Sequence, residues 1–382
     1  MKKTIIIILI VAFVISLLLL LNSCDKKTVI IKTIDSRQST TVNSGEESTE
    51  LQESNKEDIK DSIPLEDEKA FEEIYNPPKG GSPENIGKII FCSQSMETED
   101  ADYYLYTINP NSSNMTKLAF FGNWMWHPEW SPEYSRIAYS ANLIGGNKIF
   151  IMTADGSQNK QITFGDGDDK FPTWSPDGKH IAYISYINGT PNLFIIDIYG
   201  NNKKQLTFVE GKDTVLWPSF SPVEDAIAYT YNSSKEGIGE RIIVVRSDGT
   251  KIVELPPPEN PKAHFGHPGW SPDGKILYFI SNQSKYCEVW KIDYYKLIHN
   301  LTASDNDKYD DLGLMQLTHF NGNGSAVYRP RVSPDGKKLV FCGWTTDEQP
   351  SGGFNLITMN IDGTDIKNIT GFTKDDCQWP DW

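Results

Sequence analysis

One short pattern recurs along the chain and limits the fold more than any other feature of the sequence. It reads proline, any residue, an aromatic residue or valine, serine, proline. Its five full copies begin at Pro128, Pro172, Pro218, Pro268 and Pro330. Self-similarity with a period of this length indicates a repeat architecture, in which each repeat is one supersecondary unit that buries its apolar surface against its neighbours.

The second copy shows how one unit is expected to fold. Residues 172–174 form a first strand, and Ser-Pro-Asp-Gly-Lys at 175–179 forms a turn, with proline presetting φ and glycine supplying positive φ. A second strand ends on an aromatic residue at Tyr183, a third covers 192–197 and a fourth covers 204–207. Four short antiparallel strands with two apolar faces predict one blade of a β-propeller.

The two ends of the chain complete each other. Residues 379–382 form a sixth copy that stops before its turn, and the missing turn and second strand are found at 82–91, followed by strands at 104–108 and 115–118. A ring left open would expose apolar blade faces. The sequence therefore predicts an all-β fold over residues 86–382: a six-bladed β-propeller of four-stranded antiparallel blades, closed by the C-terminal strand pairing with the N-terminal strands.

These units resemble the TolB-type propeller repeat, Trp-Ser-Pro-Asp-Gly-Lys followed by an apolar strand, which occurs in the periplasmic protein TolB and in the propeller domains of prolyl oligopeptidases. The resemblance implies the propeller fold and, by analogy with TolB, a non-catalytic scaffold that binds a protein or peptide in the cell envelope. An oligopeptidase also needs a hydrolase domain with a Gly-x-Ser-x-Gly turn. The nearest approach, at 322–326, is not such a pentapeptide.

The first residues are predicted to be a targeting signal. Lys2 and Lys3 precede an apolar run at 5–21, and Cys24 follows Ser23 directly. This arrangement resembles a bacterial lipoprotein signal peptide, which implies cleavage after residue 23 and lipidation of Cys24. The alternative is an uncleaved membrane anchor. Both alternatives place the rest of the chain outside the cytoplasm, on the periplasmic side of a membrane or on the cell surface.

Residues 24–85 are predicted to be an acidic linker between the lipid and the propeller, because they lack any apolar period and are rich in Ser, Thr, Asp and Glu. Acids also exceed bases in the whole chain, 51 against 36, for a formal net charge of −15. This balance argues against a nucleic-acid partner, which requires a basic surface. We expect a monomer.

The binding surface is expected where the fourth strand of one blade connects to the first strand of the next. These loops surround the mouth of the central channel, and a mouth with aromatic and charged residues suits protein anchors or sugar rings. Alternatively, the same side chains pack between blades or line the channel wall. The candidate residues are Trp124, Trp126, His127, Lys170, Trp217, His264, His267, Tyr328, Arg329, Gln378 and Trp379.

Two kinds of metal site are considered, although no cofactor is required by the main prediction. Asp166, Asp168 and Asp169 form an acidic cluster that calcium could bind, the alternative being a solvated acidic loop. His127, His264, His267 and Gln378 resemble the three-histidine-plus-glutamine metal centre of propeller lyases that cleave pectate oligomers. The alternative function is therefore glycan binding or metal-assisted polysaccharide cleavage at the mouth. No catalytic residue is assigned.

Cysteine positions suggest one cross-link. Antiparallel register in the closing blade would put Cys377 opposite Cys92 or Ser93, so a Cys92–Cys377 disulfide could join the two ends of the chain. The alternative is that both remain buried free thiols.

Overall fold

The structure is a computed structural model of the 382-residue chain. It describes residues 85–94, 102–118, 123–143, 146–234, 239–255, 263–300, 312–320, 326–344, 353–371 and 375–382. The predicted signal peptide, Cys24 and all of the predicted linker except its last residue lie outside this part of the chain. None of the helices in the described part is long and apolar enough to cross a membrane.

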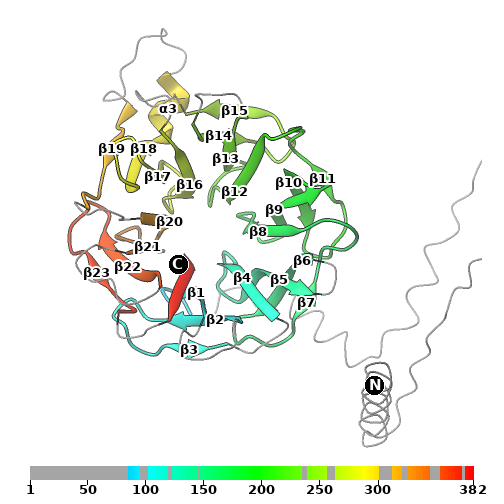
Figure 1. The fold of residues 1–382 in the computed structure, drawn as a ribbon, viewed down its shortest axis with the longest axis horizontal. Coiled ribbons are helices and arrows are strands. Elements are labelled where there is room, and N and C mark those ends of the chain that lie inside the picture. The colour runs from blue at the N-terminus through cyan, green and yellow to red at the C-terminus, as the bar shows by residue number, and fades with distance from the viewer. Residues whose placement is uncertain are drawn as a thin grey trace, which may run out of the picture. The chain divides into compact units, whose positions relative to one another are not determined.

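The described residues form six four-stranded antiparallel sheets, arranged as blades around a central axis (Figure 1). This confirms the six-bladed propeller. From the innermost strand outward, the first blade is β24 (Asp376–Asp381), β1 (Ile89–Gln94), β2 (Tyr103–Ile108) and β3 (Thr116–Lys117), and the second is β4 (Asn123–Trp130), β5 (Arg136–Leu143), β6 (Gly146–Thr153) and β7 (Lys160–Gln161). The third blade is β8 (Asp169–Trp174), β9 (His180–Ile187), β10 (Thr190–Asp197) and β11 (Lys204–Gln205), and the fourth is β12 (Thr214–Phe220), β13 (Ile227–Asn232), β14 (Arg241–Val245) and β15 (Lys251–Glu254). The fifth blade is β16 (Phe265–Trp270), β17 (Ile276–Ser281), β18 (Glu288–Asp293) and β19 (Met315–Gln316), and the sixth is β20 (Ala326–Val332), β21 (Lys338–Trp344), β22 (Asn355–Asn360) and β23 (Lys367–Asn368).

Apolar residues on both faces of the middle strands form the core between neighbouring blades. The aromatic residue of the second strand is buried in every blade, but it lies near the middle of the strand and not, as the sequence pattern had predicted, at its end. These residues are Phe91, Tyr139, Tyr183, Tyr229, Phe279 and Phe341. Because each blade has two apolar faces, it is stable only between two neighbours, which favours a closed ring over an open stack.

Ring closure follows the predicted scheme. Strand β24, from the C-terminus, pairs antiparallel with β1, the first strand of the propeller, and Ser93 lies opposite Cys377 (Figure 1). Beyond the strand, the indole N–H of Trp382 donates to the carbonyl of Gly87 at 2.9 Å, and Tyr134 donates its hydroxyl to the carbonyl of Trp382. The last residue of the chain therefore joins the first blade to the second.

The tryptophans of the repeated pattern form the same kind of hydrogen bond between other neighbouring blades. The indole N–H of Trp174 donates to the carbonyl of Glu129, one blade earlier, at 3.2 Å, and that of Trp270 donates to the carbonyl of Ser219 at 3.0 Å. Each ring fills space between blades while its one donor is satisfied by the neighbouring inner strand. This explains why the pattern places tryptophan, and not another large apolar residue, at most copies.

The serine and glycine of the pattern shape the turn. In the second copy the hydroxyl of Ser175 donates to Asp177 and accepts the backbone N–H of His180, while Gly178 N donates to the Ser175 carbonyl. Gly178 has φ of 65°, a conformation that glycine adopts without steric cost. These contacts fix a tight reversal between the first and second strands.

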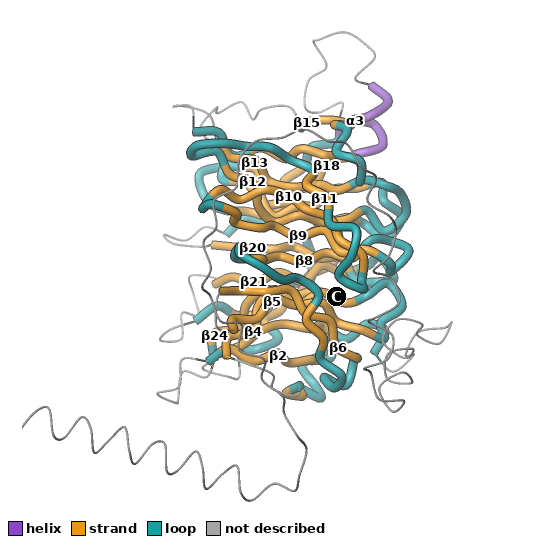
Figure 2. The backbone as a smooth tube through the Cα atoms, turned by 90° about the vertical axis from the view of Figure 1, so that its right-hand side faces the viewer, coloured by secondary structure: helices purple, strands orange, loops and turns teal. Residues whose placement is uncertain are grey.

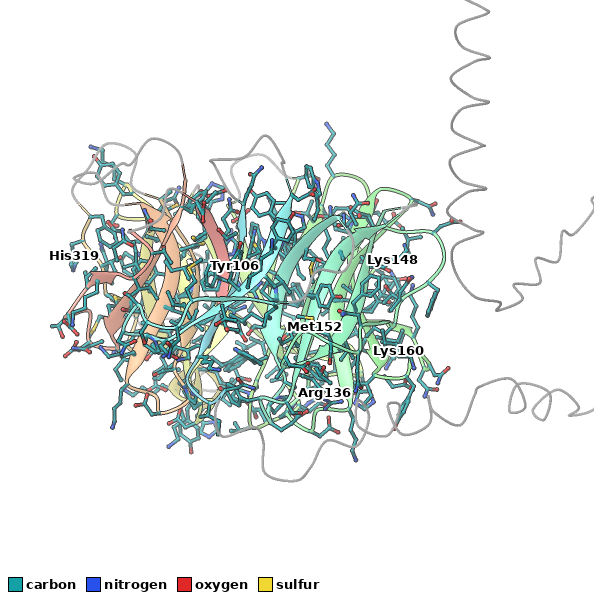
Figure 3. All side chains as sticks on the ribbon, turned by 90° about the horizontal axis from the view of Figure 1, so that it is seen from below. Tyr106, Arg136, Lys148, Met152, Lys160 and His319 are labelled. Atoms are coloured by element: carbon teal, nitrogen blue, oxygen red, sulfur yellow. The ribbon has the colours of Figure 1, made fainter. Side chains whose placement is uncertain are left out.

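The ring has two different faces. We call the end that carries the Ser-Pro turns the turn face, and the end that carries the connections between blades the loop face. In the side view of Figure 3, Arg136, at the start of β5, lies toward one face, and Lys148, near the start of β6, lies toward the other. The helix α3 (Tyr294–Asn300), between β18 and β19, lies on the outer edge of the ring (Figure 2).

The four described cysteines, Cys92 and Cys377 among them, form no disulfide. Cys377 pairs with Ser93, and Cys92 pairs with Gln378, so the two cysteines are out of register by one residue. Adjacent positions on a strand face opposite sides, and accordingly Cys92 packs against the second blade while Cys377 packs against the sixth. The predicted Cys92–Cys377 disulfide is not formed in this structure.

Replacing Trp382 should weaken ring closure strongly. Trp382→Ala removes a side chain that is 7% exposed together with its hydrogen bond to Gly87, so we expect the free energy of unfolding to fall by about 3–5 kcal/mol. Denaturant unfolding measures this. Phe208→Ala is the matched control, since its ring is 75% exposed and should change stability by less than about 0.5 kcal/mol. Equal effects of the two substitutions would contradict the closure scheme.

Candidate functional site

Each innermost strand carries a bulge at the residue just before the first proline of the pattern. The pairing with the second strand shifts register there, for example between Lys170 and Thr173. All six bulge residues have positive φ, which is uncommon for residues other than glycine and turns their side chains toward the axis. They are His127, Phe171, Trp217, His267, Arg329 and Trp379, with φ between 51° and 56°. We call them the axial cluster.

The axial cluster fills the middle of the channel. The ring of His127 lies 4.1 Å from that of Phe171 and 4.5 Å from that of Trp379, measured between centroids. On the other side, His267 stacks on Trp217 at 3.7 Å. These contacts join neighbouring blades. Trp379 also lies 5.8 Å from Phe171 and 5.9 Å from His267, which links inner strands two blades apart across the channel.

Arg329 is the charged member of the axial cluster, and it binds backbone carbonyls. Its guanidinium donates to the carbonyl of Pro380 and to that of Pro128, both at 3.2 Å. Arg329 thus connects the inner strands of the sixth, first and second blades. Arg329 is buried. It does not offer the exposed charge that was predicted for a binding residue at the mouth.

Both axial histidines are held in the neutral form. Burial, and then the charge of Arg329, lowers the pKa of His127 and of His267 well below the usual value. The hydroxyl of Ser140 donates to the carbonyl of Trp126, so the 2.8 Å contact between His127 Nδ1 and Ser140 Oγ is a bond in which the imidazole donates. A neutral imidazole packs against aromatic rings without the cost of burying a charge.

Two cavities open beside the axial cluster toward the loop face. The apolar pocket has a volume of about 220 Å³ and is bordered almost entirely by rings. It is lined by Trp217, His267, Tyr328, Cys342, Phe354, Gln378 and Trp379. Its size and lining suit one aliphatic or aromatic side chain better than a whole ligand.

The second cavity, the aromatic–amide pocket, has a volume of about 380 Å³. It shares Gln378 and Trp379 with the apolar pocket, so the two cavities are neighbours. It is lined by Trp124, Trp126, His127, Asn142, Asn147, Lys170, Phe171, Tyr186, Gln378 and Trp379. Trp124 is 42% exposed at the rim, and Trp126 stacks on Tyr103 at 3.8 Å, which fixes its orientation.

Most of the residues predicted to form the mouth are brought together in these two pockets, but His264 and Arg329 line neither. His264 lies beside Glu240, with Nδ1 3.7 Å from the carboxylate. The four residues that resembled a lyase metal centre are thus not gathered around one point. In the part of the chain that the structure describes, no group of three or more His, Cys, Asp or Glu side chains is arranged to hold a metal.

The three aspartates of the predicted calcium site do not share their contacts. Asp168 accepts hydrogen bonds from the backbone and side-chain nitrogens of Asn147 and contacts Lys170 at 2.5 Å. Asp169 is buried with Lys148 Nζ 3.9 Å away, and Asp166 is exposed. Lysine side chains thus stand next to two of the three carboxylates, and calcium binding at Asp166, Asp168 and Asp169 stays a prediction.

Besides Phe171, which aligns with the other bulge residues, five lining residues were absent from the predicted mouth: Asn142, Asn147, Tyr186, Cys342 and Phe354. They lie at or near the ends of the second and third strands, far along the chain from the proline pattern. Because strands alternate in direction, the hairpins between these two strands also reach the loop face. The order and direction of the strands, which follow from the sequence, would have predicted that these hairpins lie at the loop face.

Comparison with known proteins fits this geometry. Residues 85–263 match the family model described as the TolB beta propeller domain. Over these residues, which are less than half of the chain, the propeller is TolB-like. No curated protein sequence matches the chain.

Solved structures share the TolB-type fold at low sequence identity. TolB from Acinetobacter baumannii superposes with a TM-score of 0.59 at 18% identity, covering 78% of this chain and 66% of that protein. Putative TolB from Agrobacterium tumefaciens gives 0.54 at 16%, covering 77% and 97%. Hydrazine synthase from Kuenenia stuttgartiensis gives 0.56 at 14%, covering 77% and 46%. At these identities the likeness concerns the fold alone.

The buried histidines should make stability sensitive to acid. Because the pKa of His267 is lowered in the folded state, the unfolded chain binds more protons below about pH 6.5, and stability falls as the pH drops. We expect His267→Gln to lessen this fall by up to about 1.4 kcal/mol per pH unit between pH 6.5 and 5. Denaturant unfolding at a series of pH values measures the slope.

The control for this experiment is His180→Gln, because the side chain of His180 is 45% exposed. The change of slope in His267→Gln should exceed the change in this control. Glu129, whose pKa is raised to about 7 by burial and by Asp381, contributes a slope of opposite sign, so the comparison is made between variants and not on the unmodified chain alone. Identical slopes for all three proteins would contradict neutral, buried His267.

Proposed function

We propose that this TolB-type propeller is a non-catalytic scaffold that captures a segment of a protein or peptide at the loop face of its channel. The observation that carries the proposal is the pair of adjoining cavities above the axial cluster. The apolar pocket offers a site for one apolar anchor residue, and the aromatic–amide pocket offers amide and lysine groups beside it. A rigid aromatic pocket next to a polar groove is how peptide anchors are commonly bound.

Preorganisation supports this function. Gln378 and Trp379, which separate the two pockets, belong to β24, and Gln378 donates to Asp376, which also accepts the hydroxyl of Tyr103 at 2.8 Å. The shared wall is thus fixed by the same strand that closes the ring. A site whose walls are already ordered loses little conformational entropy on binding, which raises affinity for a given contact area.

We further propose that the chain is exported and anchored in a membrane through a lipid on Cys24. The first described residues contact the turn-face end of the propeller. The carbonyls of Gly87 and Lys88 accept the indole N–H groups of Trp382 and Trp130, two residues that border the turn-face opening of the channel. The first described residues therefore lie at the turn face, and the loop-face pockets lie at the opposite end of the channel.

A glycan is the second candidate ligand, favoured by the composition of the aromatic–amide pocket. Trp124 and Tyr186 supply ring faces, and Asn142, Asn147 and Gln378 supply amides that bond hydroxyl groups. This combination suits a sugar ring, whereas the apolar pocket beside it does not. The two candidates therefore differ in whether the apolar pocket is used.

Peptide selection tests the main proposal. Random peptides displayed on phage and selected on the full chain should share one apolar residue, and Phe354→Ala and Trp124→Ala should each weaken binding of a selected peptide at least about tenfold, because each removes an aromatic wall. Binding is measured by fluorescence anisotropy. Phe164→Ala is the matched control, an exposed aromatic residue that lines neither pocket.

Peptides that bind Phe354→Ala as tightly as the unmodified chain would count against the peptide site. Oligosaccharides bound by the full chain, lost in Trp124→Ala and retained in Phe354→Ala, would favour the glycan instead.

Lipid attachment is tested separately. In a bacterium that processes lipoproteins, a clickable fatty acid should label the chain, and Cys24→Ser should abolish the label and shift the protein's processing, because the thiol is the attachment point. Cys287→Ser, a change at a free thiol within the propeller, is the control and should keep the label. An unlabelled chain that stays in the membrane at full length would instead favour the uncleaved anchor.

A further inference from the structure

The turn-face end of the channel contains a second cavity with different chemistry. It has a volume of about 330 Å³ and lies below the axial cluster, where Glu129, Ser219, Arg331 and Asp381 are among the lining residues and the prolines of the turns form the wall. None of its lining residues belongs to the apolar or the aromatic–amide pocket. It is therefore a separate site from the one proposed above.

Two arginines stand among the acids of this cavity, but their guanidinium groups are turned to the backbone. Arg331 Nη1 donates to the carbonyls of Pro268 and Pro330 at 2.9 and 3.0 Å, and Arg329 donates to those of Pro380 and Pro128. Their contacts with the acids are longer. Arg331 Nε lies 3.4 Å from Asp381 Oδ1, and Arg329 Nη2 lies 3.6 Å from Glu129 Oε2.

The two carboxylates differ in how far they are satisfied. Glu129 Oε1 accepts the hydroxyl of Thr173 at 2.7 Å and the backbone N–H of Trp174 at 2.9 Å. Asp381 Oδ2 accepts the backbone N–H of Trp130 at 2.9 Å, and the Asp381 carboxylate also interacts with the backbone N–H of Trp382. Among the described residues, Glu129 Oε2 has only the long guanidinium contact, outside normal hydrogen-bond range. One carboxylate oxygen beside the cavity thus lacks a full donor.

The pKa shifts of these two carboxyl groups agree with this geometry. Burial, and then the charge of Asp381, raises the pKa of Glu129 to about 7, and burial raises that of Asp381, in spite of both arginines. The two acids are therefore incompletely compensated by the protein. A positive group in the cavity would stabilise their ionised forms.

We propose that the turn-face pocket binds a primary ammonium group, which donates hydrogen bonds to Glu129 Oε2 and to the carboxylate of Asp381. An ammonium carries three donors and one charge, and its alkyl chain would run along the proline and tryptophan walls. An anion would meet the negative charge of both carboxylates. A divalent metal ion would meet only two carboxylates and the repulsion of two arginines. The ammonium comes from a free amine or from a lysine side chain of another polypeptide.

Calorimetric titration of the full chain tests this with matched probes. Nα-acetyl-lysine methylamide and 1,5-diaminopentane should bind at least about tenfold more tightly than Nα-acetyl-norleucine methylamide, which has the same carbon chain and no charge. Tighter binding of the lysine derivative would assign a polypeptide source, and tighter binding of the diamine a free amine. Affinity should rise up to about tenfold from pH 6 to pH 8, as Glu129 loses its proton.

Variants locate the site. Glu129→Gln should weaken amine binding about tenfold or more by removing one charge. Because the Glu129 side chain is only 12% exposed and bonds to its neighbours, a rim variant provides an independent test. Pro222 lines the cavity at an exposed position, so Pro222→Lys places a competing ammonium there, while Pro222→Gln does not. Amine binding should be weaker in P222K than in P222Q.

Equal affinity for the lysine and norleucine derivatives would overturn the proposal. So would equal amine binding by P222K and P222Q, or the absence of amine binding by the full chain. None of these results bears on peptide capture at the loop face, which is measured with different ligands and variants.

Discussion

Backbone pairing between the last strand and the first holds the propeller together. Strand β24 contributes the inner edge of the first blade, and without it β1 would expose its edge to the channel. The same strand supplies Gln378 and Trp379 to the two loop-face pockets and Asp381 to the turn-face pocket. Closure of the ring and formation of the binding surfaces are therefore one event, and a variant that loosens β24 is expected to affect all three cavities together.

The bulge before each proline is the second constraint. A residue that precedes proline is restricted to extended conformations, and a positive φ at a bulky residue is costly. Six such residues occur together in the axial cluster, where Trp217 and His267 stack and Arg329 binds carbonyls of two other inner strands. Backbone strain of this kind persists only where surrounding contacts fix it, and it concentrates at functional sites.

Local repetition made the fold predictable from the sequence. Trp174, Ser175 and Gly178 each act through contacts within their own turn or with the adjacent blade, so their spacing alone identified strands, turns and the closing pair. The site was predictable only in part. The bulge residues follow from the alignment on proline, whereas Phe354 and Tyr186 reach the mouth through hairpins whose lengths vary between blades, and no spacing rule locates them.

Alternation along the inner strand gives the two ends of the channel their different chemistry. The residue before the first proline faces the axis and forms the cluster that lines the loop-face pockets, with Trp217 and Trp379 as examples. The residue after that proline lies one step nearer the turn face, and at this position the chain carries Glu129, Arg331 and Asp381. At the position after the proline, Glu129 and Ser219 accept the tryptophan indoles through their backbone carbonyls, which any side chain leaves available. The side chains at both positions differ from blade to blade, so one repeated scaffold can present an aromatic mouth at one end and a charged pocket at the other.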